Sequence, residues 1–221
     1  MNILTYRDIQ VDMIRKTQNP GHLIRMAMDI TMKQENYCSD AVSQNSLAFL
    51  FSAEHTEIMG HVSATFFIHD LSKSALGQIT RCRTAAKTSA SQHYQVYTEY
   101  PHMVSEQLSK LPGIDDKFLN DERAYQAALD CGIPKEEARQ VLSNAKAGNL
   151  LITFSAESLY VFFRKRLCLR NCEETRVIAE KMWDETYVWW PEFAEICGPP
   201  CMMASCNQGY LSCGKKYDRK I

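Results

Sequence analysis

Residues 71–94, LSKSALGQITRCRTAAKTSASQHY, join an amphipathic segment to a run of small and hydroxylic residues. The first half predicts a helix that begins at Ser72, whose hydroxyl is a suitable N-cap. After Arg83 the helical pattern ends, which predicts a polar loop, and residues 93–97 then predict a strand. The predicted helix has one apolar face, made of Leu71, Ala75, Ile79 and Cys82.

Arg81 and Arg83 stand where the predicted helix gives way to the loop, and they carry groups that bind anions. Guanidinium groups supply fixed positive charge, and the loop hydroxyls of Ser89 and Ser91 can hydrogen-bond a phosphate or a base edge. Basic residues near a helix C-terminus also favour the helix dipole without binding anything. Composition alone leaves both interpretations open.

The composition is that of an ordinary globular protein. The chain has 221 residues, of which 45% are hydrophobic and 23% charged, and this length fits one domain with a real core. The net charge of −1 gives no general attraction to nucleic acid or to a membrane surface. We find no run long enough to span a bilayer and no apolar signal segment, so we expect a cytoplasmic protein with neither nucleic acid nor membrane as partner.

The remaining chain predicts further elements. Asn19-Pro20 predicts the start of a helix, and a polar break at KQENYCSD leads to a second one. We expect a strand at residues 64–68, helices at 101–112 and 115–131, and another strand at 150–154. Gly132 is placed to end the second of those later helices, and Pro134 to begin a further one.

The spacing of Arg81, Arg83, Ser91 and Tyr94 resembles the signature of the flavin-dependent thymidylate synthases, RHRxxSxNxxSxRY. These four positions are kept. Four others depart from the signature: Cys82 stands for His, Ala86 for Ser, Thr88 for Asn and His93 for Arg.

Three flanking stretches strengthen the resemblance. His55 and the second histidine six residues later precede the predicted strand at 64–68, as in the family, and Gln78 lies one helical turn before the first signature arginine. Residues 132–142, GIPKEEARQVL, are similar to the family motif G(I/V)P(R/K)ExAR. Residues 153–166, TFSAESLYVFFRKR, are similar to T(x)NxRSLxNFLxLR. The matches follow the family's order over nearly the whole chain.

The resemblance implies an α/β fold, with a mixed sheet flanked by helices. It implies a single thymidylate synthase-like catalytic domain at residues 1–195, followed by a Cys-rich tail at 196–221. Subunits would form a homotetramer with active sites between them. The implied reaction transfers one carbon from methylenetetrahydrofolate to C5 of dUMP to give dTMP, and FAD carries hydride from NADPH.

The resemblance also assigns the site residues. It implies three catalytic residues, Arg166, Arg81 and Ser91. The two arginines would bind and polarise the pyrimidine. It implies contacts to a pyrimidine nucleotide monophosphate by Gln78, Ser89, Ser91, His93, Arg139 and Arg166. It implies flavin contacts by His55, Arg81, Cys82, Arg83 and Ser155. We expect His93 to bind phosphate less tightly above about pH 7 than an arginine would.

The departures from the family gather on the flavin side. Ser155 stands for Asn, Val161 for Asn or His, and Glu157 for an arginine, so a carboxylate replaces a cation near the cofactor. A flavin-free 5-hydroxymethylation of the nucleotide is therefore one alternative, and a non-catalytic nucleotide-binding homologue is another. The choice between uracil and cytosine stays open, as does a reactive thiol at Cys82.

Nine cysteines in an intracellular chain are expected to be thiols or metal ligands rather than disulfides. Four thiols of the tail are a weak candidate for a metal site, because their spacing is not the paired CxxC form. The other interpretation is a reduced, loop-rich tail. The four are Cys197, Cys201, Cys206 and Cys213.

Overall fold

The computed structural model describes residues 2–32, 40–97 and 100–218. The polar break predicted at KQENYCSD therefore lies almost entirely outside the described residues, as do residues 98 and 99. The chain divides into two compact units. The first comprises residues 1–10, 67–81 and 87–151, and the second comprises 11–66, 82–86 and 152–221. We call the first the nucleotide unit, because it holds most of the residues that the resemblance assigned to the nucleotide, and the second the flavin unit, because it holds most of those assigned to flavin.

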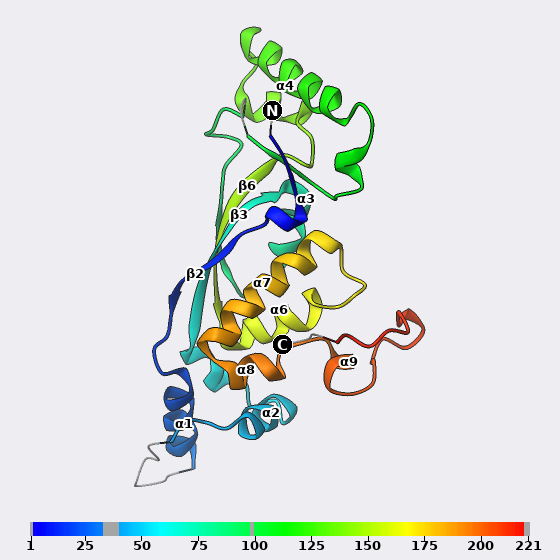
Figure 1. Cartoon of the computed structure of the whole chain (residues 1–221). Helices are drawn as coiled ribbons and strands as arrows, with labels where there is room; N and C mark the ends of the chain where they lie inside the picture. Colours follow the sequence, from blue (N-terminus) through cyan, green and yellow to red (C-terminus); the bar gives the residue numbers. More distant parts are fainter. Residues whose placement is uncertain (1, 33–39, 98–99, 219–221) are drawn as a thin grey trace. The chain divides into compact units, whose positions relative to one another are not determined.

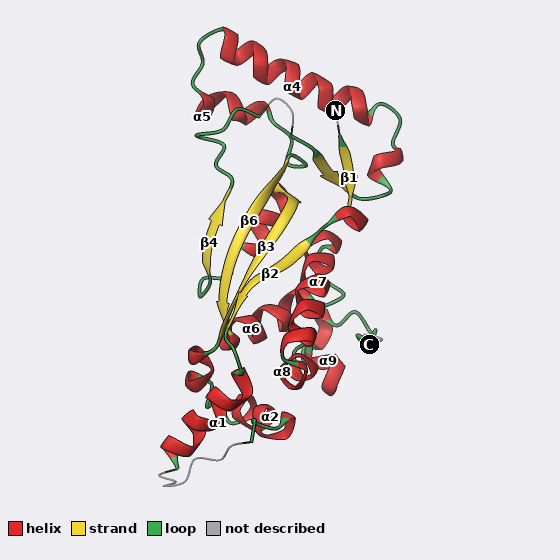
Figure 2. Cartoon of the chain, turned by 60° about the vertical axis from the view of Figure 1, so that its left-hand side comes forward, coloured by secondary structure: helices red, strands yellow, loops and turns green. Residues whose placement is uncertain are grey.

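The described strands form one four-stranded sheet in the order β2-β3-β6-β4 and one two-stranded sheet, β1-β5. Figure 2 shows β3 and β6 as the two inner strands of the larger sheet. The two short strands run parallel, with Ile3 opposite His102. The strands are β1 (Ile3–Thr5), β2 (Val11–Lys16), β3 (Ser63–Ser72), β4 (Ala86–Ser89), β5 (His102–Val104) and β6 (Ala147–Ser155).

Helices account for most of the remaining described structure. The α-helices are α1 (Pro20–Thr31), α2 (Gln44–Ser52), α3 (Lys73–Ile79), α4 (Ile114–Asp130), α5 (Lys135–Ala138), α6 (Ala156–Arg166), α7 (Glu173–Trp189), α8 (Pro191–Ile196) and α9 (Pro200–Met203). The 3-10 helices are η1 (Tyr6–Asp8), η2 (Glu57–His61), η3 (Leu108–Lys110), η4 (Arg139–Val141) and η5 (Gly209–Leu211). The mixed α/β class expected from the sequence is confirmed. In the described part of the chain, no helix has the length and apolar character that crossing a membrane requires.

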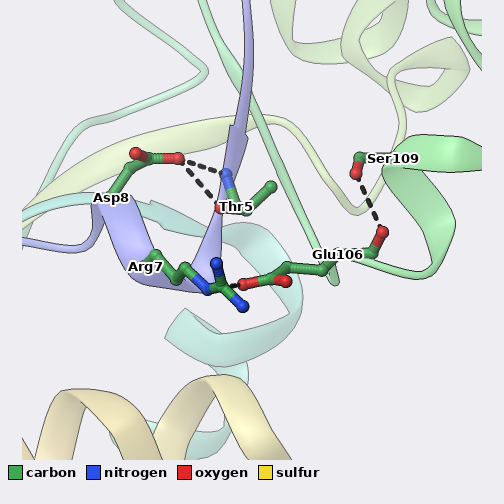
Figure 3. A network of polar contacts seen from close by, with 5 residues as sticks. All are labelled: Thr5, Arg7, Asp8, Glu106 and Ser109. Carbon is green, nitrogen blue, oxygen red and sulfur yellow. Dashed lines mark hydrogen bonds and ion pairs between the residues drawn. The ribbon is translucent and has the colours of Figure 1, made fainter.

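Within the nucleotide unit, polar contacts tie the N-terminus to the segment after β5 (Figure 3). The Asp8 carboxylate accepts hydrogen bonds from the Thr5 backbone N–H and hydroxyl, at 2.7 and 3.0 Å. These two bonds lower the pKa of Asp8 below its ordinary value. Arg7 pairs with Glu106, whose carbonyl oxygen accepts a 3.0 Å hydrogen bond from the Ser109 hydroxyl.

The core of the nucleotide unit forms along α4, whose buried face carries Phe118 and Tyr125. The Phe118 ring stacks on the imidazole of His102 with centroids 4.1 Å apart. The Lys146 ammonium group is completely buried, and it donates to Glu122 at 2.9 Å and to the Tyr100 carbonyl oxygen at 3.0 Å. A buried cation thus has a charged partner and a second acceptor, as burial requires.

The flavin unit packs α6, α7 and α8 together, and β2 also contacts α7 (Figure 1). Trp183 of α7 is buried, and its indole N–H points to the carbonyl oxygens of Ala194 and Cys197, at 2.9 and 3.0 Å. Trp190 stacks on Phe193 with centroids 4.9 Å apart. These aromatic side chains build the core around the start of the tail.

Three local predictions were wrong, and two of them fail because pairing between distant segments overrides the local pattern. The polar loop after Arg83 contains β4, which lies at the edge of the sheet beside β6. The helix predicted at 101–112 contains β5, which pairs with β1. The strand predicted at 93–97 is a turn, in which the Gln95 N–H donates to the Ser91 carbonyl oxygen at 3.1 Å.

Other predictions are confirmed. Pro20 occupies the first position of α1, and Gly132 follows α4 with a φ of +78°, a value that glycine adopts without strain. Pro134 is the N-cap of α5. The helix expected at 71–83 is shorter than predicted, because β3 runs on to Ser72 and α3 ends at Ile79.

Candidate functional site

In the nucleotide unit, α3 positions the first candidate residues. The Ser72 hydroxyl accepts the Ala75 N–H at 3.0 Å and caps the helix, as the sequence predicted. Gln78 is half-buried on this helix, and Arg81 is exposed in the turn that follows it. No ion pair or hydrogen bond holds the Arg81 guanidinium group to any described residue. Its positive charge is therefore available to an anion.

The turn at Ser91–Gln95 places the next candidates. The Ser91 hydroxyl oxygen accepts the backbone N–H of His93 at 3.2 Å, so this serine shapes the turn as well as offering a hydroxyl. The neighbouring Tyr94 is largely exposed and meets the His93 ring edge-on, with centroids 4.6 Å apart. Ser89 is exposed at the end of β4. The hydroxyls predicted to bind a nucleotide are thus presented on one short stretch.

Glu136 connects two segments that the sequence assigned separately to the substrate. Its carboxylate lies 3.6 Å from Nδ1 of His93, and its carbonyl oxygen accepts a 3.0 Å hydrogen bond from Nε of Arg139. Both side chains of the His93–Glu136 pair are about half exposed. The structure therefore brings His93 and Arg139, two predicted phosphate or nucleotide contacts, to the same place in the nucleotide unit.

Sequence reasoning gave Glu136 only a position in the motif at residues 132–142, with no role at the site. Its position opposite His93 depends on contacts between segments far apart in the sequence, which no local pattern reveals. A carboxylate here attracts the protonated imidazole and competes with a phosphate for it. Glu136 is thus a residue of the candidate site that the sequence alone did not identify.

In the flavin unit, the first turn of α6 and the segment after Arg83 are joined by serine hydroxyls. Ser155 caps the helix by accepting the Ser158 N–H at 3.2 Å, and its hydroxyl donates to the Ser158 hydroxyl at 3.0 Å. The Ser158 hydroxyl in turn donates to the Thr84 carbonyl oxygen at 3.4 Å. The Ser155 hydroxyl, predicted to contact flavin, is therefore already engaged as a helix cap.

A second contact brings the segment of His55 to the same turn. The Thr56 hydroxyl donates to Oε1 of Glu157 at 2.7 Å. His55 is exposed beside it. The three segments predicted to face flavin, around His55, Arg83 and Ser155, thus meet in the flavin unit, and the substituted carboxylate of Glu157 lies among them.

Cys82 and Arg83 occupy the same unit. The Cys82 sulfur lies 3.7 Å from the Thr84 hydroxyl oxygen. Arg83 is exposed, and its guanidinium group forms no ion pair or hydrogen bond with the described residues. One fixed positive charge of the predicted flavin set therefore remains unneutralised.

Arg166 is the last residue of α6, and Asn171 holds it from the following turn. The Asn171 side-chain N–H donates to the Arg166 carbonyl oxygen at 2.9 Å, and its amide oxygen accepts from the guanidinium group at 3.5 Å. Asn171 also donates to the Thr175 hydroxyl at 2.8 Å. This asparagine fixes both the backbone and the side chain of the predicted catalytic arginine, and sequence reasoning missed it.

The candidate residues fall into two sets. Gln78, Arg81, Ser89, Ser91, His93 and Arg139 belong to the nucleotide unit, whereas His55, Cys82, Arg83, Ser155 and Arg166 belong to the flavin unit. The tail cysteines do not form a metal centre within the described residues, where no group of three or more His, Cys, Asp or Glu side chains is placed to hold an ion. Cys197 is fully buried, and this burial raises the pKa of its thiol.

Residues 12–192 match the model of the family described as "Thymidylate synthase complementing protein". The chain is 31% identical over 177 residues to a flavin-dependent thymidylate synthase of Geobacter sulfurreducens, with 77% of this chain and 76% of the relative covered. The chain belongs to the flavin-dependent thymidylate synthase family. A relative of the same name from Clostridium tetani is 26% identical, and 96% of each chain is covered.

The fold agrees with this assignment to the flavin-dependent thymidylate synthases. A UMP/dUMP methylase, PolB from Streptomyces cacaoi, solved with 5-Br dUMP, has the same fold, with a TM-score of 0.78 and 17% identity. The alignment covers 89% of this chain and 96% of that one. A second structure of PolB, with 5-Br UMP, gives a TM-score of 0.69. As a member of this family, the chain is a methyltransferase-like enzyme.

The flavin unit fits the flavin cofactor of the flavin-dependent thymidylate synthases in part. The exposed guanidinium group of Arg83 and the imidazole of His55 suit an anionic diphosphate and a flat ring system. The Glu157 carboxylate does not suit a diphosphate, because like charges repel in a half-buried setting. The flavin unit thus offers one cationic group that would attract FAD and one anionic group that would repel its diphosphate.

Proposed function

We propose that the protein transfers one carbon from methylenetetrahydrofolate to C5 of dUMP and produces dTMP, with FAD and NADPH as cofactors. The observation that carries the proposal is the set of residues predicted to bind nucleotide, above all the exposed guanidinium group of Arg81 and the Arg139 and His93 side chains, which both contact Glu136. The family assignment supports the same reaction. FAD, when bound, carries hydride from NADPH.

The residues of this chain have separable roles in the proposed reaction. Arg81 and Arg139, with the Ser91 hydroxyl, bind the monophosphate and orient the nucleotide through charge-assisted hydrogen bonds. Arg166 faces the pyrimidine and stabilises the negative charge that develops on its carbonyl oxygen during attack from C5. Asn171 holds the Arg166 guanidinium group in one orientation. Less conformational freedom of this side chain is therefore lost when the substrate binds.

Subunit arrangement and location belong to the same proposal. We propose a homotetramer with active sites between subunits, as the family resemblance implies. Residues 1–195 then act as one catalytic domain, because β3 and β6 each contribute residues to both units, and residues 196–221 form the tail. A cytoplasmic location is supported by the described cysteines, which are all free thiols.

One alternative function has a specific observation in its favour. The Glu157 carboxylate accepts a hydrogen bond from Thr56, and the family motif that the sequence resembles has an arginine at this position. If flavin does not bind, one-carbon transfer ending with water instead of hydride gives a 5-hydroxymethyl pyrimidine nucleotide and consumes no NADPH. A non-catalytic nucleotide-binding homologue is the remaining alternative, and it predicts nucleotide binding without turnover.

Flavin binding separates the proposal from these alternatives. The absorbance spectrum of the purified protein would be recorded as isolated, and again after FAD is added and the free cofactor removed. The proposal predicts the yellow spectrum of bound oxidised flavin, whose redox chemistry the cofactor carries. A colourless protein that retains no FAD would overturn it and favour the flavin-free reaction.

A further inference from the structure

A hollow of about 300 Å³ lies in the flavin unit at the end of α6. None of the residues assigned to flavin or nucleotide lines it, although Asn171, which holds Arg166, does. Its wall combines cations with thiols, and among the described residues that line it there is no Asp or Glu. We call it the thiol hollow. Its charged and thiol-bearing lining residues are Arg164, Lys165, Arg170, Cys168, Cys201 and Cys206.

No acidic side chain among the described lining residues neutralises the positive charge of the thiol hollow. Arg164 donates a 2.8 Å hydrogen bond to the uncharged Tyr160 hydroxyl and lies 5.4 Å from the centre of the same ring. Lys165 shares the last turn of α6 with it, a position that also favours the helix dipole. Arg170 lies beyond the helix, where the dipole does not account for it. The hollow therefore attracts anions.

Cys206 differs from the other tail thiols in its hydrogen bonds. The Ser212 hydroxyl and the Gln208 backbone N–H donate to its sulfur, and these bonds, together with nearby Arg170, lower the pKa of the thiol. The Cys201 sulfur accepts a contact from the Tyr217 N–H at 3.4 Å. Donors and a cation around the sulfur stabilise the thiolate, which is the nucleophilic form.

We propose that the thiol hollow binds small anionic disulfides and that Cys206 exchanges with them. The Cys206 thiolate attacks one sulfur of the disulfide R–S–S–R, so a Cys206–S–S–R bond forms and the original S–S bond breaks. The other half leaves as RS⁻ and takes a proton from water. Cys206 is oxidised and the leaving sulfur is reduced, and the cations hold the carboxylates of R. The proposal does not depend on the nucleotide reaction.

The experiment compares an anionic with a cationic disulfide on the reduced full-length protein. Oxidised glutathione and cystamine are the two probes, and mass spectrometry of acid-quenched digests gives the rate of adduct formation at each cysteine. Cys131, an exposed thiol that does not line the hollow, is the internal control. At each cysteine we take the ratio of the glutathione rate to the cystamine rate. We expect this ratio to be at least about fivefold higher at Cys206 than at Cys131, because the attraction between two unit charges at contact distance in water is about 1 kcal/mol.

The variant Arg170→Gln tests the charge directly. A change in thiolate fraction alters both probe rates alike, so the ratio of the two rates isolates recognition of the anion. We expect this ratio at Cys206 to fall about fivefold in Arg170→Gln and to stay unchanged in Arg123→Gln, a matched change on α4. Equal ratios at Cys206 and Cys131 in the wild type, or an unchanged ratio in Arg170→Gln, would overturn the proposal.

Discussion

The Thr56 hydroxyl donates a 2.7 Å hydrogen bond to the Glu157 carboxylate, and this bond joins the segment of His55 to the first turn of α6. A negative charge at a helix N-terminus also interacts favourably with the helix dipole. The Glu157 carboxylate, at a position where the resembled family motif has an arginine, is thus anchored within the flavin unit. The question for function is what this anchored charge does to flavin binding.

Replacing Glu157 with arginine should strengthen FAD binding. We expect the dissociation constant for FAD to fall about tenfold in Glu157→Arg, because an attractive charge replaces a repulsive one beside a diphosphate. Glu157→Gln, which removes the charge but keeps an acceptor for Thr56, should lie between the two. Fluorescence titration with FAD measures all three proteins. Two variants that bind FAD no better than the wild type would contradict this role for the carboxylate.

Removing the Asn171 side chain should impair the proposed reaction more than it impairs folding. Asn171→Ala removes one hydrogen bond to the Arg166 guanidinium group and one to its carbonyl oxygen, and we expect kcat/KM for dUMP to fall about tenfold, since misorientation of a catalytic group is costly. Thr175→Ala is the matched control, because it removes the other hydrogen-bond partner of Asn171 and leaves the contacts to Arg166. Equal losses of kcat/KM in both variants would indicate a structural role only.

A fixed positive charge at position 93 should strengthen nucleotide binding. The Glu136 carboxylate lies 3.6 Å from the His93 imidazole and competes with an anionic ligand for this place. We expect the dissociation constant for dUMP to fall about fivefold in His93→Arg. Glu136→Gln should lower it as well, because this change removes the competing anion. Calorimetric titration at one fixed pH is the measurement, and two variants that bind dUMP no better than the wild type would rule out the phosphate contact.

His102 should make the fold sensitive to acid. Its imidazole is buried against Phe118, and neither ring nitrogen has a hydrogen-bond partner in the described structure. Burial, followed by the positive charge of Lys146, lowers the pKa of His102 from 6.5 to about 4. The unfolded chain therefore binds the proton more readily, and stability falls as the pH drops from about 6.5 to 4, by at most about 3 kcal/mol.

His102→Phe isolates this contribution, because a phenyl ring preserves the stacking on Phe118 and cannot be protonated. Urea unfolding at pH 7 and pH 4.5 gives the free energy of unfolding for both proteins. We expect the variant to lose less stability than the wild type between these pH values. A loss of the same size in both proteins would show that the other titrating groups account for the acid sensitivity.

The sequence predicted the elements that depend on local signals. Pro20 at the start of α1, the Ser72 cap of α3 and Gly132 after α4 each follow from the backbone preferences of one residue, and all three are present. β5 and β4 escaped prediction because their partners are remote in the sequence. The buried triplet His102–Val104 becomes a strand only through its pairing with β1.

The candidate site shows the same division. Motif spacing identified Arg81, Arg139 and Arg166, since each stands at a fixed position in a family pattern. Thr56, Glu136 and Asn171 were not identified, because each acts on a candidate residue through a contact that only folding creates. In particular, nothing in the sequence around Glu136 indicates that its carboxylate lies opposite His93.

The product formed from dUMP tests the central claim most directly. The purified protein would be incubated with dUMP, methylenetetrahydrofolate and FAD, with and without NADPH, and the nucleotide product identified by mass. We predict dTMP, formed only when NADPH is present. A 5-hydroxymethyl nucleotide formed without NADPH, or no product despite dUMP binding, would contradict the claim.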